Sequence, residues 1–198
     1  MNIAVIPARG GSKRIPRKNI KEFCGKPMIS YAISAASESR LFEKIVVSTD
    51  DEEIAQTSRE LGAEVPFRRP AELANDYTAT VPVIAHAITT CQSLGVHFNY
   101  VCCLYPAVPF IEHEDLRRSL ELLEAGTSDY AFPVTHFSSA VQRALGRGPD
   151  GTMAPLYPEY ELTRSQDLAP AYHDAGQFYW GRTEAWLTNP RIHNGGMG

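Results

Sequence analysis

The chain has 198 residues, of which 43% are hydrophobic and 21% are charged, so it can bury one sizeable core without disulfides or metals. Its formal net charge of −4 at pH 7 argues against general nucleic-acid binding, because neutralising a phosphate backbone requires a basic face. Met1 leads directly into an apolar run, and no later stretch approaches the length of a membrane span. We therefore expect a cytoplasmic protein with no membrane segment.

Short apolar runs alternate with longer stretches of helical periodicity along the chain, a pattern typical of a parallel sheet covered by helices. The helices are predicted to begin near Pro27, with Asp50 or Asp51 as a cap, and over Thr80–Leu94 and Glu112–Glu124. The sequence thus indicates an α/β fold, with a mostly parallel, twisted sheet and helices on both faces. The strands are predicted at Asn2–Ala8, Lys44–Thr49, Val65–Phe67, Tyr100–Leu104 and Tyr130–Thr135.

The alternation ends after about residue 135. A turn cluster at Gly146–Gly151 and an aromatic stretch at Tyr157–Tyr160 predict a small irregular β excursion. We expect this excursion to cover the ligand edge of the sheet and regard it as a candidate for pairing with a second subunit. Residues 1–190 are interpreted as one domain, and the glycine-rich residues 191–198 as a disordered tail.

The first predicted strand runs into a glycine turn that carries five cationic side chains: Arg9, Lys13, Arg14, Arg17 and Lys18. Gly10 and Gly11 allow backbone N–H groups to approach an anion, Ser12 adds a hydroxyl donor, and Arg9 can hold phosphate oxygens bidentately. The spacing matches neither GxxxxGK[ST] nor GxGxxG, which disfavours a Walker loop and an NAD-dependent oxidoreductase. A solvated basic loop is the alternative, but a position directly after the first strand favours a phosphate site.

The residues of this loop also resemble a known family. Ile6–Lys13, Ile15-Pro16 and Lys18-Asn19 are similar to the opening motif of the cytidylyltransferases that activate nine-carbon acidic sugars, the sialic acid synthetase group. The similarity continues through Val47–Ala55, Arg69–Asp76 and Arg164–Leu168. It implies a Rossmann-like fold of the nucleotide-diphospho-sugar transferase type. Arg14 and the run Tyr172–Trp180 resemble the pseudaminic acid branch of that group.

The resemblance implies a set of nucleotide-binding residues. Arg9, Ser12, Lys18 and Asn19, together with Gly10 and Gly11, would hold the phosphates of CTP, with Arg9 and Lys18 as catalytic residues and Lys18 nearest the transferred phosphate. Arg69 and Thr80 match positions near the nucleotide. Arg69 can also be a purely structural arginine at a strand exit, and Thr80 can be a helix N-cap.

Recognition of the sugar is expected from Tyr105 and from the polar stretch that contains Arg164, Gln166, Asp167, Asp174 and Gln177. A sugar carboxylate requires an arginine, while hydroxyl and acetamido groups bind amides and carboxylates. The sialic branch has glutamine where this chain has Tyr105, which favours a different sugar. Phe178–Trp180 can offer apolar faces to that sugar, or Phe178 and Trp180 can alternate into the core as strand residues.

Magnesium is expected as the cofactor because the family usually carries an acidic Asp-x-Asp segment near its C-terminus. This sequence reaches Gly198 without that segment, so we assign no metal ligand and expect impaired metal-dependent turnover. Asp50, Asp51, Asp167 and Asp174 are possible substitutes. Neither the cysteines nor the histidines have the spacing of metal ligands.

The sequence therefore predicts an enzyme that joins CTP to a nonulosonic acid, pseudaminic acid above the others, with release of pyrophosphate. The alternative substrates are N-acetylneuraminic, legionaminic and Kdo acids. A non-catalytic nucleotide-binding protein that lost its metal site is the alternative from another class. The expected partners are CTP, the acidic nine-carbon sugar and a second copy of the chain, with neither nucleic acid nor membrane.

Overall fold

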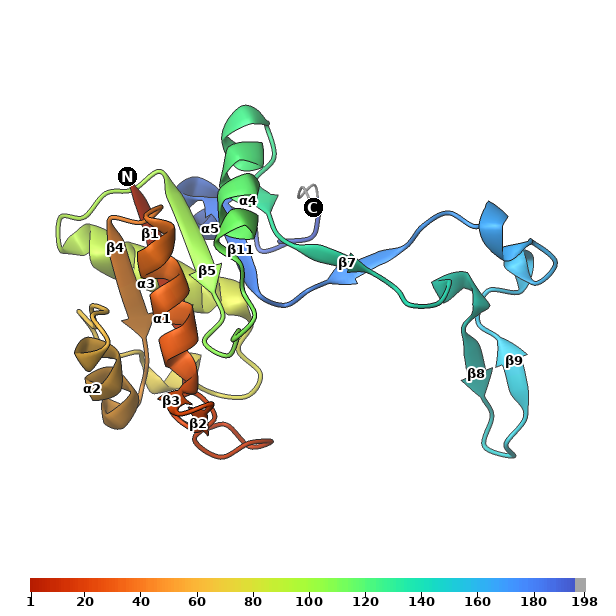
Figure 1. The fold of residues 1–198 in the computed structure, drawn as a ribbon, viewed down its shortest axis with the longest axis horizontal. Coiled ribbons are helices and arrows are strands. Elements are labelled where there is room, and N and C mark those ends of the chain that lie inside the picture. Colours follow the sequence, from red (N-terminus) through yellow and green to blue (C-terminus); the bar gives the residue numbers. More distant parts are fainter. Residues whose placement is uncertain (195–198) are drawn as a thin grey trace. The chain divides into compact units, whose positions relative to one another are not determined.

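A mixed five-stranded sheet, with strand order β4-β1-β5-β11-β6, forms the framework of the protein. The computed structural model describes residues 1–194. Three strands run parallel, namely β1 (Asn2–Pro7), β4 (Lys44–Ser48) and β5 (Tyr100–Leu104). β11 (Phe178–Arg182) lies antiparallel between β5 and β6 (Tyr130–Ala131), and Figure 1 shows it beside β5. The predicted α/β class with a mostly parallel core is confirmed.

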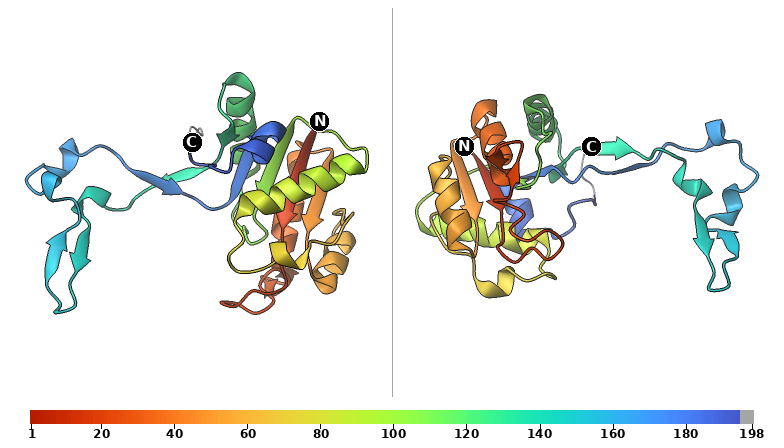
Figure 2. Two further views of the ribbon diagram at one scale, coloured as in Figure 1. Left: turned by 180° about the vertical axis from the view of Figure 1, so that it is seen from behind. Right: turned by 60° about the horizontal axis from the view of Figure 1, so that its bottom comes forward.

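Helices cover both faces of this sheet. On one face, α1 (Met28–Ser39) contacts both α2 (Glu52–Glu60) and α4 (His113–Ala125). On the other face, α3 (Thr80–Ser93) contacts α5 (Thr183–Thr188), and Figure 2 shows α3 from that side. The four residues Ile3–Ile6 of β1 are completely buried, as expected for a strand whose two faces are both covered.

The chain divides into two compact units. The first comprises Met1–Pro133 and the chain from Gly176 onward, and the second comprises Val134–Ala175. In addition to the sheet and helices, the first unit contains a short hairpin of β2 (Glu22–Phe23) and β3 (Lys26–Pro27) and one turn of 3-10 helix at Ala71–Leu73.

The second unit consists of two short antiparallel strand pairs. β7 (Val134–His136) pairs with β10 (Tyr172–Asp174), and β8 (Leu145–Arg147) pairs with β9 (Met153–Pro155). No residue from 134 to 175 is buried, so this unit has no core of its own. Single turns of 3-10 helix connect its strands at Val141–Arg143, Pro158–Tyr160 and Ser165–Asp167.

The four predicted helices are present, and the predicted cap of α2 is confirmed. Asp51 is the N-cap, and its Oδ1 accepts a hydrogen bond of 3.0 Å from the backbone N–H of Ile54. Two acidic residues, Glu52 and Glu53, follow in the first turn. The side-chain acceptor satisfies a free backbone N–H at this end of the helix. The negative charges interact favourably with the positive end of the helix dipole.

Two predicted strands need correction. The expected strand at Val65–Phe67 is wrong, because only the preceding Glu64 forms an isolated bridge, to Val46. Pro66 has no N–H to donate, which explains why pairing does not continue. The expected strand at Tyr130–Thr135 is interrupted at Phe132-Pro133 and divided between β6 and β7.

Two tryptophans fix β11 in the sheet. The indole N–H of Trp180 donates 3.0 Å to the carbonyl of Leu116 in α4, and its ring stacks on Phe42 with centroids 5.0 Å apart. Trp186 of α5 donates 3.0 Å to the carbonyl of Val101 on the opposite face. A Cβ at Gly181 would lie only 2.4 Å from the Trp186 nitrogen, so this close approach requires glycine. Of the two interpretations of Phe178 and Trp180, the core one is confirmed.

Residues 1–194 contain no helix that is long and apolar enough to span a bilayer. Near the end of the described chain, Ile192 is buried and the His193 ring packs edge-on against Phe132, with centroids 5.2 Å apart. The rest of the expected disordered tail, residues 195–198, lies outside the described residues.

We predict that Trp180→Ala lowers the free energy of unfolding by about 3–5 kcal/mol, because it removes a buried aromatic ring and leaves a cavity. The Leu116 carbonyl also loses its indole donor. Urea denaturation followed by circular dichroism measures this loss. The control is Tyr77→Ala, which truncates a side chain of a residue that is 95% exposed and should change stability by less than about 0.5 kcal/mol. Equal stabilities of the two variants would contradict the role assigned to Trp180.

Candidate functional site

The glycine loop after β1 is docked on the junction between β4 and α2. The backbone N–H of Gly10 donates 3.0 Å to Oδ1 of Asp50. A Cβ at Gly10 would lie 2.6 Å from Oδ2 of Asp51, whereas a Cβ at Gly11 would meet nothing within 4 Å. Gly10 is therefore required by the close approach of two segments, and its N–H already has an internal carboxylate as partner.

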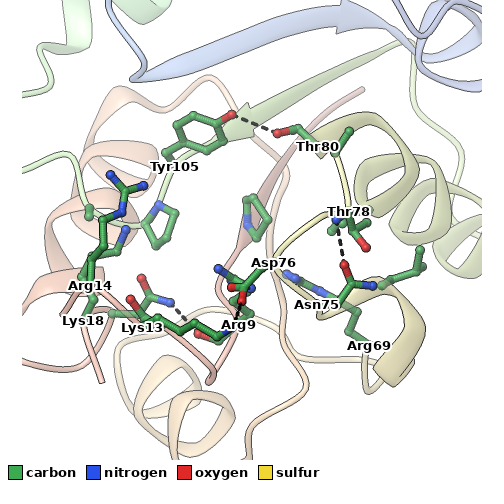
Figure 3. A pocket seen from close by; sticks show the side chains of 18 of the residues that line it. Arg9, Lys13, Arg14, Lys18, Arg69, Asn75, Asp76, Thr78, Thr80 and Tyr105 are labelled. Carbon is green, nitrogen blue, oxygen red and sulfur yellow. Dashed lines mark hydrogen bonds and ion pairs between the residues drawn. The ribbon is translucent and has the colours of Figure 1, made fainter. Parts of the chain in front are cut away.

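A cleft of about 710 Å³ opens beside this loop, at the carboxyl ends of β1 and β5. Open α/β sheets bind their ligands at this edge. All of its lining belongs to the first unit, and Figure 3 draws most of the lining side chains. The polar and charged lining residues are Arg9, Ser12, Lys13, Arg14, Lys18, Asn19, Arg69, Asn75, Asp76, Thr78, Thr80 and Tyr105.

Positive charge dominates the cleft, since five cationic side chains line it against the single carboxylate of Asp76. Asp76 lies between two of these cations. Its Oδ1 is 2.6 Å from Nη1 of Arg9, and its Oδ2 pairs with the ammonium of Lys13, as Figure 3 shows. The hydrogen bond from Lys13, followed by that from Arg9, lowers the pKa of Asp76 below its ordinary value. A cleft with this excess of cations attracts anions.

Lys18 and Asn19 lie next to each other in the cleft wall but differ in their bonding. The ammonium of Lys18 has no hydrogen bond or ion pair within residues 1–194. Asn19 is 4% exposed, and its Nδ2 donates 3.0 Å to the carbonyl of Arg9. Its Oδ1 is buried and has no partner, which leaves an unused acceptor in the wall of an otherwise cationic cleft.

Arg69 is buried at the end of β4, with 4% of its surface exposed. Its Nε donates 3.0 Å to Oγ of Ser48, and its Nη2 donates to the carbonyl of the same residue. Burial lowers the pKa of Arg69 to about 10, so the guanidinium stays charged at neutral pH. Arg69 therefore anchors the segment after β4 and also brings its charge to the cleft.

Thr80 and Tyr105 join two elements across the cleft. Their hydroxyl oxygens are 2.9 Å apart, as Figure 3 shows. Ala79 is the N-cap of α3 and Thr80 is the first helical residue, so the interpretation of Thr80 as an N-cap is wrong. The ring of Tyr105 packs edge-on against Tyr179 of β11, with centroids 5.6 Å apart. The backbone N–H of Tyr105 donates 3.0 Å to the carbonyl of Gln177.

A sequence profile described as cytidylyltransferase matches residues 3–179. The chain belongs to the cytidylyltransferase family. It is 42% identical over 186 residues to a pseudaminic acid cytidylyltransferase of Campylobacter jejuni, a match that covers 94% of this chain and 80% of that protein.

Two further proteins show the range of the similarity. The CMP-N,N'-diacetyllegionaminic acid synthase of Legionella pneumophila is 41% identical over 120 residues, which cover 61% of this chain and 52% of that protein. Among solved structures, a CMP:2-keto-3-deoxy-manno-octonic acid synthetase complexed with CTP superposes with a TM-score of 0.70 at 21% identity. That match covers 93% of this chain and 75% of the synthetase, and it supports the fold.

The cleft of this cytidylyltransferase brings together seven of the residues expected from the sequence. Gly10 and Gly11 belong to the same loop but do not line the cleft, and neither does Gln177. Four other candidates for sugar binding, Arg164, Gln166, Asp167 and Asp174, lie in the second unit. The seven residues in the cleft are Arg9, Ser12, Lys18, Asn19, Arg69, Thr80 and Tyr105.

Sequence reasoning did not assign the segment from Asn75 to Thr78 to the site. Oδ1 of Asn75 accepts hydrogen bonds from the backbone N–H groups of Tyr77 (2.8 Å) and Thr78 (2.9 Å). This turn presents Asp76 to the cleft. The position of the segment between β4 and α3 was the signal that could have found it, since this connection crosses the ligand edge of a parallel sheet.

The carboxylates considered as substitutes for the family's magnesium ligands have other partners. Asp50 accepts from Gly10, Asp51 caps α2 and pairs with Arg17, and Asp167 pairs with Arg164. Within residues 1–194, no group of three or more histidine, cysteine, aspartate or glutamate side chains could hold a metal ion. The described residues therefore do not fit a magnesium site built by the protein alone.

We predict that Asp76→Asn strengthens binding of inorganic triphosphate to the cleft. The substitution removes the negative charge between Arg9 and Lys13, and exposed ion pairs of this kind correspond to about a two- to fivefold change in affinity. Isothermal titration calorimetry measures the change. Asp115→Asn, in the first turn of α4, removes the same charge outside the cleft lining and should leave the affinity unchanged. Weaker binding by Asp76→Asn would mean instead that Asp76 is needed to position the two cations.

Proposed function

We propose that the protein transfers CMP from CTP to a nonulosonic acid, with pseudaminic acid as the preferred acceptor. The cationic cleft at the carboxyl ends of β1 and β5, in a chain of the cytidylyltransferase family, carries this proposal. The 42% identity to the pseudaminic acid cytidylyltransferase supports the choice of acceptor. The anomeric hydroxyl of the sugar attacks the α-phosphorus, the bond from that phosphorus to the bridging oxygen breaks, and pyrophosphate leaves. The hydroxyl proton passes to solvent.

The loop after β1 is proposed to bind the triphosphate. Arg9, Ser12, Lys18 and Asn19, which line the cleft, are assigned to the phosphates. Gly10 and Gly11 are assigned to shaping this loop, since the N–H of Gly10 is bonded to Asp50. Cations around the transferred group offset the charge that spreads over the phosphorus oxygens in a loose transition state. The ammonium of Lys18 has no carboxylate partner within residues 1–194 that would have to be displaced first, which supports its assignment nearest the transferred phosphate.

The nucleoside part of CTP is assigned to the neighbourhood of Arg69 and Thr80, which line the same cleft. Tyr105, also in the cleft, is assigned to the sugar together with Gln177. Arg164, Gln166, Asp167 and Asp174 of the second unit are also proposed as residues that recognise the sugar. Arg164 supports this assignment because its side chain is 73% exposed and can exchange its partner Asp167 for a sugar carboxylate.

Magnesium, a second subunit and a cytoplasmic location are parts of the proposal. Since the described carboxylates build no metal site, magnesium is proposed to enter bound to CTP, where it neutralises phosphate charge.

A homodimer is supported by the second unit, whose large apolar side chains are exposed. The two units of the chain are proposed to belong to one nucleotidyltransferase. The exposed apolar side chains are Phe137, Leu145, Met153, Leu156, Tyr157, Tyr160, Leu162 and Tyr172.

One assay tests the proposed reaction against its alternatives. Pyrophosphate release is followed with CTP or ATP in the presence of pseudaminic, legionaminic, N-acetylneuraminic or Kdo acid, with magnesium present. We expect release only with CTP, and fastest with pseudaminic acid. Faster release with another acid would make that acid the preferred acceptor and would leave the proposed transfer of CMP unchanged. CTP binding without release for any acid would favour a nucleotide-binding protein, and equal use of ATP would contradict the cytidylyltransferase reaction.

We predict that Lys18→Ala slows CMP transfer or weakens CTP binding by more than about tenfold, since a hydrogen bond to a charged group contributes roughly 1.5–3 kcal/mol. Initial rates over a range of CTP concentrations measure the effect. Lys21→Ala is the matched control, because Lys21 is an exposed lysine three residues further along that does not line the cleft. Similar rates for Lys18→Ala and Lys21→Ala would remove Lys18 from the proposed site.

We predict that Arg164→Ala raises the KM for the acidic sugar by about tenfold or more and leaves the KM for CTP within about twofold, because a charge-assisted contact to a carboxylate is lost. Steady-state kinetics with each substrate varied in turn measure both values. Arg147→Ala removes an exposed arginine from the same unit and should change neither. If Arg164→Ala affects both substrates equally, the residue has a folding role instead.

A further inference from the structure

Arg17 is a cation of the glycine loop that does not line the cleft. Its guanidinium is directed to the N-terminus of α2, where Nη2 lies 3.0 Å from Oδ1 of Asp51 and Nη1 pairs with Oδ2 of the same residue. Nη2 also pairs with Glu53. Two parallel bonds between an arginine and a carboxylate fix orientation as well as distance. Arg17 therefore joins the loop to α2 through a two-pronged contact.

The backbone of Arg17 has an uncommon conformation that fits this role. Its φ angle is 55°, in the left-handed region that non-glycine residues rarely adopt. Its carbonyl accepts hydrogen bonds from the N–H groups of Ile20 (3.1 Å) and Lys21 (2.9 Å). The chain thus turns sharply at Arg17, and the two residues that follow, Lys18 and Asn19, line the cleft.

Asp51 links the same clamp to the glycine turn. Its Oδ1 caps α2 by accepting from Ile54, and its Oδ2 occupies the space that a Cβ of Gly10 would enter. The hydrogen bond from Arg17 lowers the pKa of Asp51 below its ordinary value, so the carboxylate is charged at neutral pH. The start and the end of the loop are therefore both held against one side chain.

We infer that Arg17 is a positioning residue, which docks the loop on α2 through Asp51 and so holds Lys18 and Arg9 in the cleft. The inference rests on the proposed function, in which these two residues bind the triphosphate. When the clamp is removed, only a fraction of the molecules has the loop docked, and the apparent affinity for CTP falls by that fraction. Saturating CTP selects the docked state again. The KM for CTP therefore rises, while kcat at saturating CTP is retained.

The first experiment compares CTP kinetics of Arg17→Ala, Arg17→Lys and Asp51→Asn. Asparagine is also a good N-cap, so Asp51→Asn removes the carboxylate while it keeps the start of α2. For Arg17→Ala and Asp51→Asn we expect the KM for CTP to rise about fivefold, in line with the upper range for a partly exposed ion pair, and kcat to stay within about twofold. Arg17→Lys should recover part of the loss, because lysine keeps the charge but not the fork.

The double variant distinguishes a clamp from two independent effects. If Arg17 acts through Asp51, Arg17→Ala combined with Asp51→Asn raises KM no further than the larger single effect. Additive effects would overturn the inference. A lower KM for Asp51→Asn would also overturn it, because release from Asp51 would then free Arg17 to bind the triphosphate directly.

Hydrogen exchange of the ligand-free protein separates this inference from the proposed function. We expect Arg17→Ala to accelerate exchange at the amides of Gly10, Lys18 and Ile20, which are bonded in the docked loop, with unchanged exchange in β5. Unchanged exchange in the loop would overturn the docking role, whatever the kinetics. Faster exchange combined with no CTP binding by the wild-type chain would contradict the proposed function and leave the docking by Arg17 supported.

Discussion

Repulsion among the cations of one short loop is the constraint on which the site depends. Five basic side chains lie between residues 9 and 18. Without negative partners, their mutual repulsion would destabilise the folded conformation of the loop. Carboxylates from two other segments meet this requirement. Asp76 lies between Arg9 and Lys13 at the cleft, and Asp51 holds Arg17 at the start of α2. The ammonium of Lys18 is left without such a partner within residues 1–194.

This distribution of charge separates two tasks within the loop. Asp51 is part of a helix cap, and its partner Arg17 does not line the cleft. Asp76 belongs to a turn that is held by the hydrogen bonds of Asn75 and Thr78. In the proposed function, a phosphate would meet Arg9 and Lys13 where the carboxylate of Asp76 lies. A triphosphate carries more charge than one aspartate and can replace it at both cations. In the proposed function, Asp51 thus holds the loop through Arg17, and Asp76 pairs with Arg9 and Lys13 until the triphosphate replaces it.

Much of the fold followed from local patterns, because β1, β4, β5 and the four long helices each carry their own periodicity. The strand at Val65–Phe67 was predicted wrongly because its apolar residues were considered, but not the inability of Pro66 to donate a backbone hydrogen bond. β11 was recognised only as one of two alternatives, since an antiparallel strand that returns to a parallel sheet has no local signal. Most of the cationic side chains of the cleft could be predicted from one loop, because they are close together in the sequence. Asp76 and the Arg17–Asp51 pair depend on contacts between residues more than 30 positions apart, which no local spacing reveals.

The aromatic residues near the cleft limit how an apolar part of a sugar can be recognised. Phe178 and Trp180 are completely buried and Tyr179 is 4% exposed, so the run considered as an apolar face for the sugar is part of the core. Tyr105 is different, because it lines the cleft and packs edge-on against Tyr179. Its hydroxyl is hydrogen-bonded to the hydroxyl of Thr80. This bond fixes the orientation of the ring. An aromatic ring held in this way offers an apolar surface where the sialic branch has an amide. If Tyr105 contacts the sugar, as proposed, that exchange favours an acceptor with a less polar substituent at this position.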